Sequence, residues 1–175
     1  ADPLRPRVAK VSAVSSGEFK ASESKPLPAG YVPPASHQIR PGDLLFTRAS
    51  GSVELIGVAA IVPPIDAEIY LPDKLWRVEI SSTTRVTRTF LRLLFRQPAF
   101  RAHIANESSG ASGVRNISQS KVLAFSALIP DIADQVEFEA KAETSGAIRT
   151  QSLSHLAKLD ELFASLQYRA FRGEL

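Results

Sequence analysis

The sequence predicts an α+β fold, in which a domain with a mostly antiparallel sheet is followed by a long C-terminal helix of the coiled-coil type. Strand and turn signals alternate between residues 40 and 80, and apolar residues take helical spacing from residue 84 onward. After Pro130 no strand pattern appears. We therefore divide the chain into a domain over residues 1–127 and a helical segment over residues 128–175.

Residues 1–40 are rich in Pro and Ser, which predicts extended and looped backbone at the periphery of the fold. One short strand is expected over 7–14, where apolar residues alternate. The strands of a β-meander then follow at 44–48, 54–62 and 75–80, separated by turns rich in Pro, Gly and Ser. The single Trp, Trp76, is expected to pack in the last of these strands.

A helix is predicted over 84–96, with N-caps offered by Ser82, Thr83 and Thr84. Pro98 breaks this helix, and a second short helix runs through Ala105 to a Ser/Gly loop at 106–113. The apolar stretch at 121–130 is predicted to return to the sheet as a strand.

The segment after Pro130 is predicted to be one long helix, weakened near residues 144–146. Its last part repeats apolar residues in steps of three and four, as in the seam between paired helices. The predicted helix-pairing residues are Leu156, Leu159, Phe163, Leu166 and Ala170. An isolated helix is marginal in water, so this seam packs either on another helix or on the domain of its own chain.

Composition excludes several classes of protein. Apolar residues make up 44% and charged residues 22% of the chain, and the longest apolar run is far shorter than the ~20 residues of a membrane-spanning helix. The chain has no Cys, which rules out disulfides and thiolate chemistry and fits a reducing cytoplasm. Its three His residues lack the spacing of metal ligands, and no common catalytic motif is present. We expect a soluble protein without catalytic activity, metal or cofactor.

Charge is unevenly distributed along the chain. Residues 1–127 hold 16 Lys and Arg against 10 Asp and Glu, whereas residues 128–175 hold 5 against 8. The predicted helix over 84–96 aligns Arg85, Arg88, Arg92 and Arg96 in one stripe, and no acid occurs between Glu79 and Glu107. Because the planar guanidinium suits phosphates and guanine edges, the stripe indicates nucleic acid. The alternative is an amphipathic helix whose solvated face is rich in Arg.

Several motifs in order along the chain resemble one half of the specificity subunit of type I restriction-modification systems. They are IRPGDLLFTRASGS at 39–52, LIGVAAIV after it at 55–62, SSGASGVRNIS at 108–118, ALIPDIADQ at 127–135 and LDELFASLQYRAFRGEL at 159–175. The closing segment is the most specific of these motifs. Family members usually carry two recognition domains and two helices, whereas this chain has one of each, so it is either a half-subunit or a fragment.

The resemblance implies a target recognition domain that reads one half of a bipartite double-stranded DNA sequence, joined to a helix that sets spacing and docks methyltransferase (modification) subunits. Through them the chain would associate with restriction subunits, and it would itself catalyse nothing. The candidate DNA contacts are Arg48, Arg85, Arg88, Arg92, Arg115 and Asn116. Asn116 either pairs with an adenine edge or caps a turn.

The helical seam also predicts assembly, as a homodimer through the C-terminal helix or as a complex with a methyltransferase. The alternative function, from another class, is a protein-interaction module that dimerises through this helix and binds an acidic protein rather than DNA.

Overall fold

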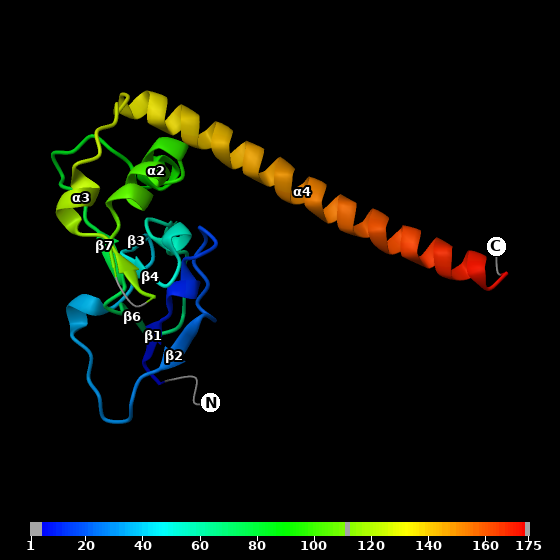
Figure 1. Cartoon of the computed structure of the whole chain (residues 1–175), viewed down its shortest axis with the longest axis horizontal. Coiled ribbons are helices and arrows are strands. Elements are labelled where there is room, and N and C mark those ends of the chain that lie inside the picture. Colours follow the sequence, from blue (N-terminus) through cyan, green and yellow to red (C-terminus); the bar gives the residue numbers. More distant parts are fainter. Residues whose placement is uncertain (1–4, 111–112, 174–175) are drawn as a thin grey trace. The chain divides into compact units, whose positions relative to one another are not determined.

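The computed structural model describes residues 5–110 and 113–173, and the chain forms two compact units, Ala1–Pro130 and Asp131–Leu175 (Figure 1). The first unit combines short strands with short helices, and the second is a single long helix. This confirms the predicted α+β class with a mostly antiparallel arrangement of strands.

The centre of the first unit is a sheet of β5 (Ala59–Ile61), β3 (Leu44–Thr47) and β7 (Leu75–Val78), in that order and antiparallel throughout. The strands predicted at 44–48 and 75–80 are thus confirmed. The strand predicted at 54–62 is present only near its end. A 3₁₀ helix, Val53–Leu55, and a turn at Gly57 with φ +80° precede β5, because the chain must reverse direction to pair with β3.

All four residues of β3 are buried, and its side chains alternate between two hydrophobic cores. Leu45 points into the first core, and Leu44 and Phe46 point into the second. The neighbouring strands follow the same alternation, as the register Leu45↔Ala60 and Phe46↔Trp76 requires. A single sheet therefore separates the two cores.

The first core is closed by a second sheet, in which β1 (Arg7–Ala9) lies between β2 (Ser24–Pro26) and β6 (Ile69–Tyr70). β1 pairs in parallel with β6 and antiparallel with β2. The expectation that residues 1–40 are peripheral is wrong, because Ala13, Val14 and Phe19 are buried in this core. The strand predicted over 7–14 ends at Ala9, and a 3₁₀ helix, Val11–Ala13, turns these apolar residues inward. A further 3₁₀ helix covers Ala35–His37.

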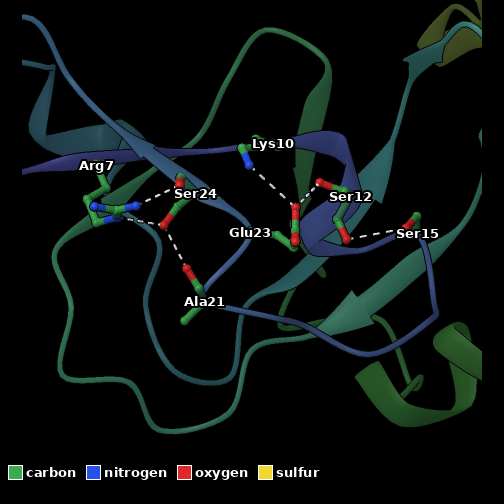
Figure 2. Close-up of polar contacts among 7 residues, drawn as sticks. All are labelled: Arg7, Lys10, Ser12, Ser15, Ala21, Glu23 and Ser24. Carbon is green, nitrogen blue, oxygen red and sulfur yellow. Dashed lines mark hydrogen bonds and ion pairs between the residues drawn. The ribbon is translucent and has the colours of Figure 1, made fainter.

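Polar contacts fix this N-terminal segment (Figure 2). The Arg7 guanidinium donates hydrogen bonds to the hydroxyl and the carbonyl of Ser24, at 2.8 and 2.6 Å. The Glu23 carboxylate accepts a hydrogen bond of 2.6 Å from the Ser12 hydroxyl and lies 3.5 Å from the Lys10 ammonium. The contacts join the 3₁₀ helix to β2, across a long loop in sequence.

The second core is covered by three helices, α1 (Arg88–Leu94), α2 (Pro98–Glu107) and α3 (Gln119–Leu123). Its centre is aromatic: the Phe46 ring lies 5.3 Å from Phe95, which lies 4.8 Å from Phe100. The Phe100 ring in turn lies 5.1 Å from Phe125. Edge-to-face and offset geometries of this kind add to the hydrophobic gain. The predicted second helix is confirmed, with Pro98 in its first turn.

The structure corrects the prediction of a helix over 84–96. α1 begins only after Thr87, whose extended backbone (φ −88°, ψ 156°) and hydroxyl cap the helix by accepting a 3.0 Å hydrogen bond from the Phe90 amide. Ser82, Thr83 and Thr84 therefore do not cap it. Arg85 precedes the helix and Arg96 follows it, so the predicted stripe of four Arg is reduced to Arg88 and Arg92 on α1.

The strand predicted over 121–130 is also wrong. α3 occupies its start, capped by Ser118, and Val122 and Phe125 pack on the second core from positions three residues apart. The short strands β2, β6 and β4 (Ala49–Ser50) were not predicted from the sequence. Neither was β8 (Arg115–Asn116), which pairs with β4. Its two residues, Arg and Asn, carry no apolar signal.

The second unit is the helix α4 (Ile132–Phe171), 40 residues long, as predicted for this segment. The weakening predicted at 144–146 does not interrupt it. Thr144 and Thr150 donate their hydroxyls to the carbonyls of Ala140 and Gly146, at 2.9 and 3.1 Å, so their polar groups are satisfied within the helix. Among the described residues, no helix combines the length and the apolar character needed to cross a membrane.

We predict that Gly57→Ala destabilises the first unit more than Gly42→Ala does. Both glycines have positive φ, +80° and +84°, where an L side chain costs about 1–2 kcal/mol. At Gly57 a Cβ atom would also lie 2.8 Å from Nη1 of Arg101 and 3.2 Å from Ile104, whereas nothing lies within 4 Å at Gly42. Overpacking should cost roughly 1–3 kcal/mol more. Chemical denaturation measures both variants, and equal losses would contradict the steric argument.

We also predict that Glu23→Gln reduces the loss of stability in acid. The hydrogen bond from Ser12, and then the charge of Lys10, lower the pKa of Glu23 below its ordinary value of 4.5. When the pKa of a carboxyl group is lower in the folded state, the group stabilises the fold at pH values above its pKa in the unfolded state. This stabilisation is lost as the pH falls through its pKa in the folded state. Urea midpoints of the wild type should therefore fall more steeply below pH 4.5 than those of the variant. Glu18→Gln, an exposed carboxyl group nearby, is the control and should leave the slope unchanged.

Candidate nucleic-acid interface

The pairing of β4 with β8 brings together three of the six predicted DNA contacts. Ala49 lies opposite Asn116, and Ser50 lies opposite Arg115. Arg48, directly before β4, accepts a 3.0 Å hydrogen bond at its carbonyl from the amide of Ile117. The side chains of Arg115 and Asn116 are exposed, whereas the paired strand β4 and the following Ile117 are buried. The pair therefore presents its polar residues outward from a fixed base.

The segment that leads into β8 is held in a narrow hairpin. The amides of Ser109 and Asn116 each donate to the carbonyl of the other, at 2.9 and 2.8 Å. A Cβ atom on Gly110 would lie 2.0 Å from the carbonyl oxygen of Val114, so only glycine fits there. Residues 111 and 112 of the predicted Ser/Gly loop lie outside the described residues.

Arg48 lies on the face of Trp76. Its guanidinium carbon is 5.5 Å from the centre of the indole ring, within the range of a cation–π contact. Trp76 in turn stacks on Phe46, with ring centres 6.0 Å apart and an interplanar angle of 12°. The Arg48 amide donates a 3.0 Å hydrogen bond to the carbonyl of Lys74. Sequence reasoning placed Trp76 in its strand, as confirmed, but not beneath Arg48, because strand register cannot be read from one sequence.

Helix α1 holds a second group of the predicted contacts. Arg88 and Arg92 are one helical turn apart on its surface, while Leu91 and Phe95 fix the helix to the second core. Arg85 lies in the exposed segment before the helix and has interactions of its own. The six predicted residues therefore fall into a group around β4 and β8 and a group on and before α1.

The basic residues of the first unit differ in what occupies them. Arg77 forms a 2.9 Å ion pair with Asp43 and donates a 2.9 Å hydrogen bond to the carbonyl of Ser36. Arg101 donates to the carbonyls of Ile56 and Glu54, at 2.6 and 2.5 Å, and its burial lowers the pKa of its guanidinium. Both side chains serve the fold.

By contrast, none of the ion pairs found among the described residues includes Arg48, Arg88, Arg92 or Arg115. No acid of the described residues therefore neutralises these four cations, of which Arg88 and Arg115 are exposed and Arg48 and Arg92 half-buried. His103 is occupied: its Nε2 atom lies 2.8 Å from the carbonyl oxygen of Lys121 and its ring lies against Phe125. Within the described residues, no cluster of three or more His, Cys, Asp and Glu side chains could hold a metal ion.

The five predicted helix-pairing residues are all exposed on α4, the only helix or strand among the described residues of the second unit. Leu159 and Phe163, at the middle of the seam, each expose 61% of their surface. Nearby Leu153, Leu162 and Phe171 widen the apolar surface. No other element of this unit covers the seam, and the last two residues of the chain lie outside the described residues.

Comparison with known proteins gives three curated relatives. The chain is 28% identical to the type I restriction enzyme EcoKI specificity subunit of Escherichia coli (strain K12), over 96% of this chain and 37% of that protein. The chain is similar to type I restriction enzyme specificity subunits. Identity is 27% to the EcoEI specificity subunit of Escherichia coli, over 85% of this chain and 25% of that protein. The chain is 28% identical to the StySPI specificity subunit of Salmonella potsdam, over 76% of this chain and 29% of that protein.

The resemblance read from the sequence motifs is thereby confirmed. No protein-family profile matches the chain. The chain spans between 25% and 37% of the length of these type I specificity subunits, and the matches extend over both of its units in the first of them.

Proposed function

We propose that this chain is a non-catalytic DNA specificity component of a type I restriction-modification system, in which the first unit recognises one half of a bipartite duplex sequence. The similarity to three type I specificity subunits, over 76% to 96% of this chain, is the observation that carries the proposal. In such a role the chain selects the DNA site and its partners perform the chemistry.

The first unit has the chemistry that DNA recognition needs. Residues 1–127 carry an excess of Lys and Arg, and the exposed Arg88 and Arg115 and the half-buried Arg92 make no ion pairs among the described residues. The exposed amide of Asn116 has the donor and acceptor that pair with an adenine edge. We propose that Arg88 and Arg92 contact phosphates, which position the domain, and that residues around β8 contact bases.

We further propose that α4 docks a methyltransferase subunit or pairs with a second copy of this chain. The exposed seam supports this role, because burying its apolar side chains against a partner would lower the free energy of the helix relative to leaving them in water. If two copies pair with two-fold symmetry, the two recognition domains are related by the same axis, and the preferred DNA site becomes palindromic.

The DNA proposal predicts that the double variant Arg88→Ala, Arg92→Ala binds every duplex more weakly. Each lost phosphate contact should reduce the slope of log K against log salt by about 0.9. Gel shifts or fluorescence anisotropy over a range of salt measure both effects. The control, Arg149→Ala with Lys158→Ala, removes the same charge from α4 and should change neither. Unchanged affinity and slope in a folded Arg88, Arg92 variant would make these residues a solvated face. Absence of duplex binding by the wild type, alone and with a methyltransferase, would favour the protein-interaction module.

The assembly proposal predicts that Leu159→Lys with Phe163→Lys abolishes pairing while the first unit stays folded. Lys side chains in the seam would place charges where apolar side chains must meet. Sedimentation velocity measures pairing with a second copy of the chain, and pull-down of a methyltransferase subunit measures docking of that partner. The matched control, Ser154→Lys with Ser165→Lys, adds the same charges to the opposite face of α4 and should preserve pairing. A wild-type chain that is monomeric and captures no methyltransferase would contradict the proposal.

A further inference from the structure

Arg48, directly after β3, and Trp76, on the neighbouring strand β7, form a site with more specific chemistry than a basic patch. Phe46 and Arg48 are two residues apart in β3 and its extension, so their side chains leave the sheet on the same face. Trp76 lies directly opposite Phe46 on β7 and stacks on it. From there its indole also reaches diagonally to Arg48, whose guanidinium lies over the ring.

The backbone at Arg48 is held from both sides. Its amide donates to the carbonyl of Lys74, before β7, and its carbonyl accepts from the amide of Ile117, after β8. The root of this side chain is thus fixed between two elements that are distant in sequence. Its far end rests on an indole that is itself stacked on the buried Phe46. Few rotamers remain open to an Arg that is restrained at both ends.

No acid of the described residues pairs with this guanidinium, and its Nε atom is buried without a hydrogen bond. Buried polar atoms are usually satisfied, and exceptions in native structures concentrate at functional positions. The indole ring covers only the flat face of the guanidinium. The terminal N–H groups of Arg48 point outward in the plane of the guanidinium, so stacking does not prevent them from donating to acceptors in that plane. Arg77, on the same strand as Trp76, has its donors occupied by Asp43 and Ser36.

We infer that Arg48 and Trp76 form a rigid reading site for a planar pair of hydrogen-bond acceptors, with Trp76 as the positioning residue. This inference rests on the proposed DNA function. Two acceptors of matching geometry exist on duplex DNA, the O6 and N7 atoms of guanine in the major groove and a pair of phosphate oxygens. Arg115 and Asn116 lie beside Arg48 across the β4–β8 pairing, so the site continues into neighbouring polar groups.

Arg48→Lys tests the site, because lysine keeps the charge but loses the planar fork. The probe is a pool of duplexes randomised over the target length, selected separately with the wild type and with the variant. If Arg48 reads guanine, the variant loses the preference for G at one position, and affinity for the wild-type sequence falls roughly 5- to 150-fold. If it binds phosphate, affinity falls for all duplexes and the selected sequence stays the same. The control, Arg96→Lys, makes the same change at an exposed Arg that follows α1 and is not one of the candidate contacts, and it should alter neither result.

Trp76 gives a second, independent measurement, because it is the single Trp of the chain. DNA binding should change the emission of Trp76 in the wild type and should leave it nearly unchanged in Arg48→Lys. Trp76→Phe, which keeps an aromatic face, should retain most of the affinity, whereas Trp76→Leu should lose as much as Arg48→Lys. If Trp76→Leu does not fold, the emission of Trp76 in wild type and Arg48→Lys decides alone.

Equal affinity, equal selected sequence and equal emission change in wild type and Arg48→Lys would overturn the inference and leave the proposed function standing. A wild-type chain that binds no duplex under any salt condition, with or without a methyltransferase, would instead overturn the proposed function and the inference with it.

Discussion

The first unit depends on the alternation of side chains along β3. Because successive residues of a strand point to opposite faces, the buried run Leu44–Thr47 contributes to both cores at once. Leu45 requires the N-terminal sheet as its cover, and Leu44 and Phe46 require the helices. A slip of one residue in the register of β3 would exchange the two sets and bury each against the wrong partner. The same alternation carries the half-buried Arg48 to the face of the aromatic core, directly after the end of the strand.

The position of the candidate site follows from this constraint. β4 continues directly from Arg48, and β8 can pair with it only because α1 and α2 bring the chain back over the second core. Ile117 shows the connection: its side chain is buried in that core, while its amide holds the carbonyl of Arg48. The positions of the exposed Arg115 and Asn116 therefore depend on the packing of the second core. Mutations in the aromatic core should disturb the proposed site without touching it.

Sequence reasoning succeeded where a pattern has one physical cause. The alternation in LWRVEI and the long helix after Pro130 were predicted correctly, because apolar residues recur with the period of a strand in the first and with helical spacing in the second. Prediction from the sequence failed where tertiary contacts, rather than the local pattern, determine the structure of a short segment. The apolar run at 121–130 has strand composition, yet Val122 and Phe125 meet the core from a helical turn. β8 has only the polar Arg115 and Asn116, so hydrophobicity could not reveal it, and the register that places Trp76 under Arg48 is a property of the folded sheet. Charge indicated the candidate Arg residues near α1, and the family resemblance and predicted loops indicated Arg48 and Arg115, but their grouping required the fold.

The two units carry opposite charge and different exposed chemistry, which suits the separate tasks proposed for them. An acidic balance over residues 128–175 disfavours non-specific contact of α4 with the phosphate backbone, while its exposed Leu and Phe seam offers burial to a protein surface. The first unit has the reverse character, with exposed Arg side chains over a closed aromatic core. If the charges were mixed evenly along the chain, DNA would compete with protein partners for the helix. Separation of charge along the sequence would thus make the proposed DNA recognition and the proposed assembly compatible in one short chain.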